Sequence, residues 1–160
     1  MPMTTAPEQL RRLLEQATTL SLATVDAADQ PHAANVNFVG DEQLNLYWLS
    51  SPDSAHSQHL AGHPRVAATA YPPFADPAEI RGVQLHGHAV LVSADRFELL
   101  WTRFCEKFPY ATGMEERARS QRFYQLTPHW ARLIDNSVRF GFKQEWQLRS
   151  TPPPPSREST

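Results

Sequence analysis

The amino-acid sequence predicts a mainly β fold in which six or seven antiparallel strands form a small barrel with helices packed against it. Short apolar or alternating runs follow one another along the chain, and several are separated only by tight turns, which is typical of antiparallel pairing. The chain has 160 residues, of which 41% are hydrophobic, and this is enough for one domain with a substantial core. A closed sheet buries such a pattern without leaving long exposed edges.

The first elements are a helix and two strands. Apolar residues recur at i, i+3, i+4 and i+7, as in an amphipathic helix, at Leu10, Leu13, Leu14 and Ala17. A short apolar strand is predicted over residues 20–26, and an alternating strand over 32–39. Asn35 and Asn37 share one face of the second strand, and they either face solvent or need hydrogen-bond partners.

A strand-to-helix junction dominates the next stretch. Residues 44–49 predict a buried strand that runs straight into a short helix ending near Gly62. The junction itself offers serine hydroxyls and a proline suited to a first helical turn, Ser50-Ser51-Pro52-Asp53-Ser54. A helix N-terminus exposes unpaired N–H groups and a partial positive charge. The junction therefore either grips a phosphate, or its serines only cap the helix.

The second half of the chain continues the sheet. Strands are predicted over residues 65–71 and 80–93, separated by a proline-rich loop. Gly82 and Gly87 in the longer strand suit a bulge, a barrel corner or the close approach of a ligand.

The last elements are helical and then extended. A helix over 95–108 carries an apolar stripe that is expected to pack in the core: Phe97, Leu100, Trp101, Phe104 and Phe108. A polar segment over 114–122 predicts a short surface helix or loop, and two strands follow over 123–135 and 140–148. We expect one domain over residues 1–150 and a disordered, proline-rich tail over 151–160.

Charge, apolar content and cysteine content limit the classes of protein to which the chain can belong. The net charge of −2 gives no electrostatic reason to expect a nucleic-acid partner. No window approaches the roughly 18 consecutive apolar residues of a membrane span, and the N-terminus lacks the apolar core of a secretory signal. The single cysteine, Cys105, cannot form an intrachain disulfide. These features favour a cytoplasmic protein that binds neither nucleic acid nor membrane.

Histidines form two groups that deserve comparison with metal or haem sites. His56, His59 and His63 share roughly one helix face, and His86 and His88 share a strand face. No cysteine or carboxylate completes a ligand set, so a solvated histidine face is the simpler interpretation and no metal is expected. The chain also lacks a glycine-rich phosphate loop, an HExxH motif and a GxSxG motif, and no catalytic residue can be assigned.

Several segments together resemble a known family. They are LSLATVDAADQPHAANVNFV, LYWLSSPDSAHSQHL, AGHPRVAATA, IRGVQLHGHAVLV and ARLIDNSVRFGFKQEW. In this order and spacing the chain resembles the pyridoxamine 5'-phosphate oxidase-like, FMN-binding split-barrel superfamily, and within it a small bacterial branch of uncharacterised proteins. The resemblance implies a six-stranded antiparallel split β-barrel with helices packed at its ends. It also implies a homodimer that binds FMN in a cleft between subunits.

The resemblance also implies the positions of the cofactor-binding residues. The flavin ring is expected along the second and third strands, against Asn35, Val36, Asn37, Trp48, Leu49 and Ser50. The phosphate is expected at Ser51, Ser54 and His56, and the fifth strand is expected to offer Gln84 to the ring edge. Lys143 and Trp146 of the C-terminal segment are expected to close the site from the partner subunit.

The chain departs from the family pattern at the phosphate. Flavin-binding members usually carry Lys or Arg just inside the helix, where this chain has Asp53, Ala55 and His56. Loss of one charged hydrogen bond, worth roughly 1.5–3 kcal/mol, weakens affinity by one or two decades unless another cation compensates. His56, Arg65, Arg81 and Lys143 are the candidates.

The resemblance therefore implies an FMN-dependent oxidoreductase with an unknown small-molecule substrate, in which the cofactor supplies the redox chemistry. Pyridoxamine-phosphate oxidation itself is less expected, because no basic cluster for the substrate's phosphate is evident. The alternative is a non-enzymatic protein on the same dimeric fold that binds flavin, haem or another planar ligand. A third possibility is a dimeric scaffold with an empty cleft.

Overall fold

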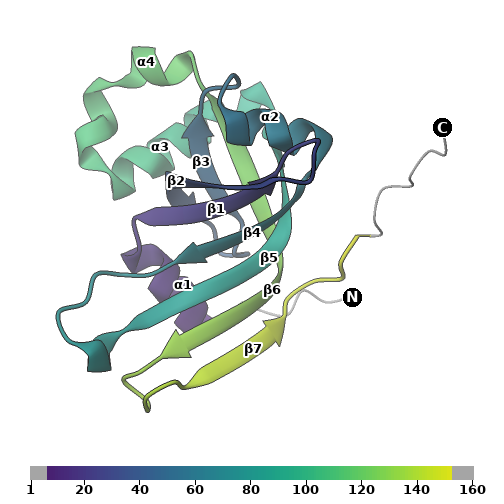
Figure 1. The fold of residues 1–160 in the computed structure, drawn as a ribbon. Helices are drawn as coiled ribbons and strands as arrows, with labels where there is room; N and C mark the ends of the chain where they lie inside the picture. The colour runs from purple at the N-terminus through teal and green to yellow at the C-terminus, as the bar shows by residue number, and fades with distance from the viewer. Residues whose placement is uncertain (1–6, 153–160) are drawn as a thin grey trace.

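The computed structural model describes residues 7–152 and shows a closed six-stranded barrel with flanking helices (Figure 1). The strands are β1 (Thr19–Val25), β2 (Pro31–Gly40), β3 (Leu46–Ser50), β4 (Arg65–Ala70), β5 (Arg81–Leu91), β6 (Arg122–Asp135) and β7 (Lys143–Gln147). The α-helices are α1 (Glu8–Gln16), α2 (Ala55–Gly62), α3 (Phe97–Lys107) and α4 (Glu115–Arg119). Three 3₁₀ turns accompany them, η1 (Pro77–Glu79), η2 (Ala94–Arg96) and η3 (Pro109–Gly113).

One antiparallel sheet contains all seven strands in the order β3-β2-β1-β4-β5-β6-β7. The barrel closes because β3 also pairs with β6, with Leu46 opposite Leu126 and Ser50 opposite Arg122. β7 pairs only with β6 and lies outside the closed circuit, at the lower edge in Figure 1. The predicted fold class, a six-stranded antiparallel barrel with flanking helices, is confirmed.

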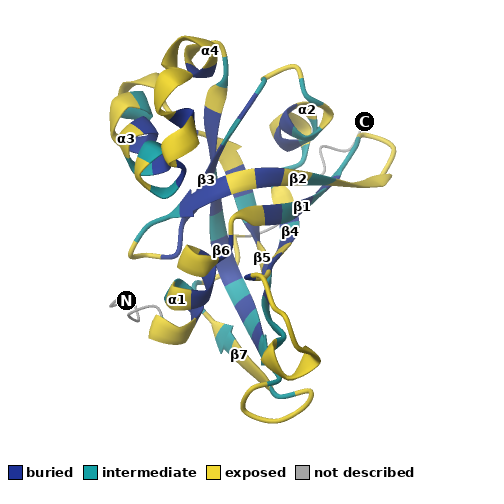
Figure 2. Cartoon of the chain, turned by 90° about the vertical axis from the view of Figure 1, so that its left-hand side faces the viewer, coloured by how far each residue is buried: buried dark blue, intermediate teal, exposed yellow. Residues whose placement is uncertain are grey.

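The barrel interior holds the main hydrophobic core. Along β6, fully buried residues alternate largely with partly buried ones, as the dark blue and teal segments of that strand in Figure 2 show. Phe38, Trp48 and Leu126 are fully buried in this cluster. Leucines of α1 join the same cluster, so this helix packs on the barrel core through its predicted stripe. Each buried leucine contributes about 1.5–3 kcal/mol relative to an exposed one.

A second apolar cluster lies outside the barrel. The stripe of α3 packs against outward-facing side chains of β2, β3 and β6, with Trp101, Phe104 and Phe123 in contact. The prediction that this stripe packs in a hydrophobic core is confirmed. The stripe packs in the layer between the helix and the barrel, however, and not in the barrel interior. This layer fixes α3 beside the outer face of β2 and β3.

The third strand begins later than predicted. Leu44 has φ 63°, a left-handed conformation that interrupts a strand, so β3 starts at Leu46. The carboxylate of Asp41 explains the turn, because its Oδ1 accepts from the backbone N–H of Gln43 and of Asn45, both at 2.9 Å. Its Oδ2 accepts from the hydroxyl of Tyr47 at 2.9 Å.

A bulge interrupts the longest strand pairing, which is one of the three alternatives that the glycines of β5 suited. The register between β5 and β6 shifts between His86 and Gly87. A Cβ at Gly87 would lie 2.3 Å from the carbonyl oxygen of Thr127, so only glycine fits there. Beside the bulge, His88 Nδ1 lies 2.7 Å from His129 Nε2, and the two rings stack with centroids 4.8 Å apart.

Two expectations concern the ends and surface of the chain. Of the predicted tail, residues 153–160 lie outside the described residues, and Thr151 and Pro152 are exposed without regular structure. Across residues 7–152, no helix combines the length and apolarity that a membrane crossing requires.

The bulge gives a stability prediction. Replacing Gly87 with alanine forces a Cβ into the Thr127 carbonyl, and the expected loss of unfolding free energy is about 1–3 kcal/mol. Urea unfolding followed by circular dichroism measures it. Gly113→Ala is the matched control, because a Cβ there meets nothing within 4 Å. Equal stability of the two variants would contradict the role assigned to the bulge.

The stacked histidine pair gives a pH prediction. Burial lowers the pKa of His129, with smaller contributions from His88 and Arg149. The unfolded state then takes up a proton at a higher pH than the folded state, so stability is lost as pH falls below about 6.5. We expect His129→Gln to have a shallower dependence of unfolding free energy on pH than the wild type between pH 7.5 and 5.5. His86→Gln, at an exposed position on β5, is the control and should keep the wild-type slope.

Candidate functional site

A cavity of about 380 Å³ lies on the outer faces of β2 and β3, bounded by α2, α3 and the η3–α4 segment. We call it the β2–β3 cavity. Its volume falls within the range of small-ligand sites. Half of the cofactor-binding residues expected from the sequence line it: Asn35, Val36, Asn37, Leu49, Ser50 and His56.

Two amides form the polar wall of this cavity. Asn35 and Asn37 share one face of β2, as the alternation predicted, and of the two alternatives left open this face is the exposed one. The Oδ1 of Asn35 accepts from the Ser21 hydroxyl at 2.8 Å, and the Nδ2 of Asn37 donates to the Tyr110 hydroxyl at 2.7 Å. Among the described residues, the remaining Nδ2 of Asn35 and Oδ1 of Asn37 have no side-chain partner. The wall therefore offers free N–H groups of both amides and the free Oδ1 of Asn37.

The opposite wall is largely apolar and was missed by the sequence analysis as part of a site. Trp101 and Phe104 of α3 line the cavity and also pack in the outer cluster, with ring centroids 5.9 Å apart. Tyr110 and Met114 add partly exposed side chains from the following segment. The periodicity of α3 predicted that these aromatic residues pack in the core. Because they lie at the edge of the packed layer, they pack in the core and also line the cavity.

The strand-to-helix junction is arranged for capping. Ser54 is the N-cap of α2, since its Oγ accepts from the N–H of Ser57 at 3.4 Å and donates to the Ser51 carbonyl at 2.9 Å. Ser51 Oγ accepts from the N–H of Asp53 at 3.2 Å. Ser51, Asp53 and Ser54 do not line the β2–β3 cavity, so Asp53 does not obstruct it. Phosphate binding by Ser51 and Ser54 stays a prediction.

His56 joins the junction to the cavity. Its Nε2 lies 2.8 Å from Ser50 Oγ and 3.2 Å from Ser54 Oγ. Burial, with a smaller contribution from His59, holds the pKa of His56 below its usual value. The imidazole is therefore mainly neutral at pH 7, and it can offer a hydrogen bond to an anion but little charge.

A cation does line the cavity, but it is none of those considered from the sequence. Arg117 of α4 contributes to the wall together with Gln121. Within residues 7–152 its guanidinium has no ion-pair or hydrogen-bond partner, whereas Arg119 of the same helix pairs with Glu98 and Glu115. The polar composition of residues 114–122 predicted a surface segment, and nothing in the sequence placed it near the second strand.

Other predicted residues lie elsewhere. The Trp48 side chain is fully buried inside the barrel, where it stacks on Tyr124 with centroids 6.0 Å apart. The expectation that Trp48 shapes the ring pocket is therefore wrong: the strand alternation points it inward, and Leu49 faces the cavity instead.

Three further residues are on the far strands of the sheet. Gln84 on β5 accepts from Arg132 at 3.2 Å, Lys143 is exposed on β7, and Trp146 packs partly against the barrel core. None of the three lines the β2–β3 cavity. Their contribution from a partner subunit stays a prediction.

The remaining candidate cations also lie away from this cavity. Arg81 donates to Gln16 at 3.1 Å, and Arg65 lines a different cavity of about 980 Å³. We call the latter the histidine cavity, because four histidines line it: His63, His86, His88 and His129. The Nδ1 atoms of His63 and His129 are buried and lack a hydrogen-bond partner among the described residues.

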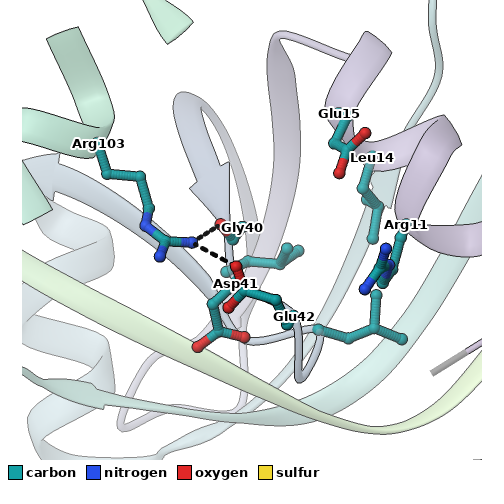
Figure 3. Close-up of a pocket in the computed structure, with 9 residues that line it drawn as sticks. Arg11, Leu14, Glu15, Gly40, Asp41, Glu42 and Arg103 are labelled. Carbon is teal, nitrogen blue, oxygen red and sulfur yellow. Dashed lines mark hydrogen bonds and ion pairs between the residues drawn. The ribbon is translucent and has the colours of Figure 1, made fainter. Parts of the chain in front are cut away.

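A small third cavity of about 150 Å³ lies between α1 and the turn that joins β2 to β3 (Figure 3). Arg103 reaches into it and donates to the Gly40 carbonyl at 2.9 Å, and its Nη1 lies 3.8 Å from a carboxylate oxygen of Glu42. Its volume is below the usual range for ligand pockets, and its arginine already has partners within the protein. We interpret this cavity as structural.

Comparison with known proteins places the fold in context. The chain is 29% identical over 147 residues to a "UPF0306 protein" of Serratia proteamaculans, a match that covers 91% of this chain and 98% of that protein. Among solved structures, a heme binding protein from Mycobacterium smegmatis superposes with a TM-score of 0.73 at 19% identity, covering 90% of this chain and 60% of that one. HutZ, the haem storage protein from Vibrio cholerae, gives 0.60 at 18% identity, covering 78% and 91%.

A sequence model of one family covers most of the chain. The family is described as pyridoxamine 5'-phosphate oxidase, and the match runs over residues 6–135, from α1 to the end of β6. The six strands of the closed barrel and the residues that line the β2–β3 cavity lie within the matched residues. This chain belongs to the pyridoxamine 5'-phosphate oxidase family.

Proposed function

We propose that this protein binds FMN in the β2–β3 cavity as a homodimer and acts as a flavin-dependent oxidoreductase on a small molecule. The observation that carries the proposal is the convergence of six expected cofactor residues on one cavity of about 380 Å³. Bound FMN would supply hydride or electron transfer, and the protein would supply orientation and electrostatics.

The cavity suits a flat heteroaromatic ring. Trp101 and Phe104 provide apolar surface for the faces of such a ring, while Asn35 and Asn37 lie where its polar edge would reach. The free donor of Asn35 and the free acceptor of Asn37 complement the alternating carbonyl and N–H groups of a pyrimidine-type edge. This match supports a ring with hydrogen-bonding capacity on one side only.

Arg117 is the residue proposed to bind the phosphate of FMN. A guanidinium can donate two parallel hydrogen bonds to a phosphate, and it replaces the basic residue that the junction lacks. Ser50 and the neutral His56 line the same cavity and add hydrogen-bonding groups without charge. The chain thus retains one phosphate-binding cation, supplied by α4 rather than by α2.

A homodimer would complete the cavity. Tyr110 at its edge is 63% exposed, and Phe140, in the loop between β6 and β7, is 82% exposed. Large exposed apolar side chains are typical of association surfaces. Gln84, Lys143 and Trp146 lie outside the cavity of their own subunit, and a second copy could bring them to it.

Replacement of Arg117 tests the proposal. We expect wild-type protein to bind about one FMN per chain as a dimer, and Arg117→Ala to weaken binding by one or two decades, because a charged hydrogen bond is worth roughly 1.5–3 kcal/mol. Quenching of flavin fluorescence measures affinity, and analytical ultracentrifugation measures the mass. Arg119 lies two residues further along α4 and does not line the cavity, so Arg119→Ala should bind FMN as the wild type does. Equal affinity of all three proteins would exclude Arg117 as the phosphate ligand, and no FMN binding to the wild type would overturn the proposal.

A second candidate function is non-enzymatic binding of haem or another planar ligand in the histidine cavity. The observation that favours it is the four histidines that line a cavity of about 980 Å³, two of which, His63 and His129, have a buried Nδ1 without a hydrogen-bond partner among the described residues. The likeness to proteins described as binding or storing haem supports the same candidate.

Haemin titration separates the two candidates. If the histidine cavity binds haem, added haemin should give a saturable Soret band that His129→Ala reduces, while Arg117→Ala leaves it unchanged. If the β2–β3 cavity binds FMN alone, the haemin spectrum should match that of free haemin at every ratio. A Soret band that survives His129→Ala would move the haem site elsewhere.

A further inference from the structure

Three side chains converge where the β1–β2 hairpin meets α2. Asp26 follows the end of β1, His32 lies at the start of β2, and His59 belongs to α2. One potential ligand atom from each lies within 4.8 Å of the other two. From the sequence, no carboxylate was expected to complete a ligand set with the helix histidines. The fold brings Asp26 to His59, and that expectation is corrected.

The carboxylate of Asp26 is divided between two tasks. Its Oδ1 accepts from the backbone N–H groups of Ala28 at 2.8 Å and Gln30 at 2.9 Å, which fixes the hairpin turn. Its Oδ2 lies 3.3 Å from His32 Nε2. The two backbone bonds, the Gln30 bond first, lower the pKa of Asp26, so the carboxylate is ionised at neutral pH. One oxygen thus holds the turn while the other faces the histidines.

His59 is oriented by a buried hydroxyl. The Oγ1 of Thr24, a residue only 1% exposed, lies 2.8 Å from His59 Nδ1. Metal-binding histidines usually engage the nitrogen that does not bind the metal in this way, which fixes the ring. The contact leaves Nε2 of His59 for a ligand. The rings of His32 and His59 lie with centroids 4.5 Å apart.

The spacing suits a small divalent ion. Ligand atoms at 2.0–2.1 Å from a tetrahedral metal are separated from one another by about 3.3–3.4 Å. The 3.3 Å between His32 Nε2 and Asp26 Oδ2 already has this value. The ligand atom of His59 lies within 4.8 Å of the other two, so the three side chains can close on one ion by side-chain rotation.

We propose that Asp26, His32 and His59 form a binding site for a divalent transition-metal ion of the Zn²⁺ type, with a fourth position open to water. Two imidazoles and one carboxylate are a donor set that Zn²⁺ accepts with an open position. Because the ligands come from the hairpin and from α2, a bound ion would link the helix to the barrel wall. This site is independent of the FMN proposal.

Zinc titration of tag-free, chelator-treated protein tests the site. Isothermal titration calorimetry with Zn²⁺ should give one saturable ion per chain, and saturating Zn²⁺ should raise the melting temperature. His59→Ala and Asp26→Asn should each weaken Zn²⁺ binding at least tenfold. Asp26→Asn keeps an oxygen for the turn N–H groups, so the hairpin is preserved while the ligand oxygen is lost.

His86→Ala is the matched control, because it removes an imidazole outside the cluster and should retain wild-type Zn²⁺ affinity. Circular dichroism of the metal-free variants establishes that each is folded. Absence of saturable binding to the wild type would overturn the proposal. Binding that survives both His59→Ala and Asp26→Asn would also overturn it, by placing the ion at other histidines.

Discussion

The pairing of β3 with β6 is the interaction on which the rest of the structure depends. Without it, β3 would be an edge strand and the barrel interior would open to water. The pairing sets Trp48 opposite Tyr124 and seals their rings inside the core. It also fixes the outward direction of Leu49, which lines the β2–β3 cavity. Closure of the barrel and formation of the candidate site are therefore consequences of one register.

The electrostatics of that site differ from those of the family pattern in a specific way. A cation on α2 would be held close to the helix N-terminus, whereas Arg117 approaches from a short helix on the other side of the cavity. His56, with its lowered pKa, does not duplicate the charge. The same anionic ligand could thus be retained although the residue that usually binds it is absent.

Much of the fold was predictable from the sequence, because the spacing of apolar residues and the residue types at turns are local properties of the chain. The alternation in 32–39 placed Asn35 and Asn37 on one shared face, and a bulge was among the alternatives that Gly87 suited. Trp48 lies on the inward-facing side of β3, a local property of the strand that a family resemblance does not convey. Arg117 and Asp26 could not be found in this way, because their partners come from distant segments brought together only by barrel closure.

The hydrogen bond between Asn37 and Tyr110 ties the 3₁₀ turn after α3 to the second strand. A ligand that takes up the Asn37 amide in another geometry must compete with that phenol. Ligand binding in the cavity and displacement of the turn are then thermodynamically coupled. A ligand that favours the displaced turn binds more tightly when the turn is already displaced, by the same free energy by which the bound ligand favours displacement. The rate at which a bound molecule leaves would be governed in part by how often this tether opens.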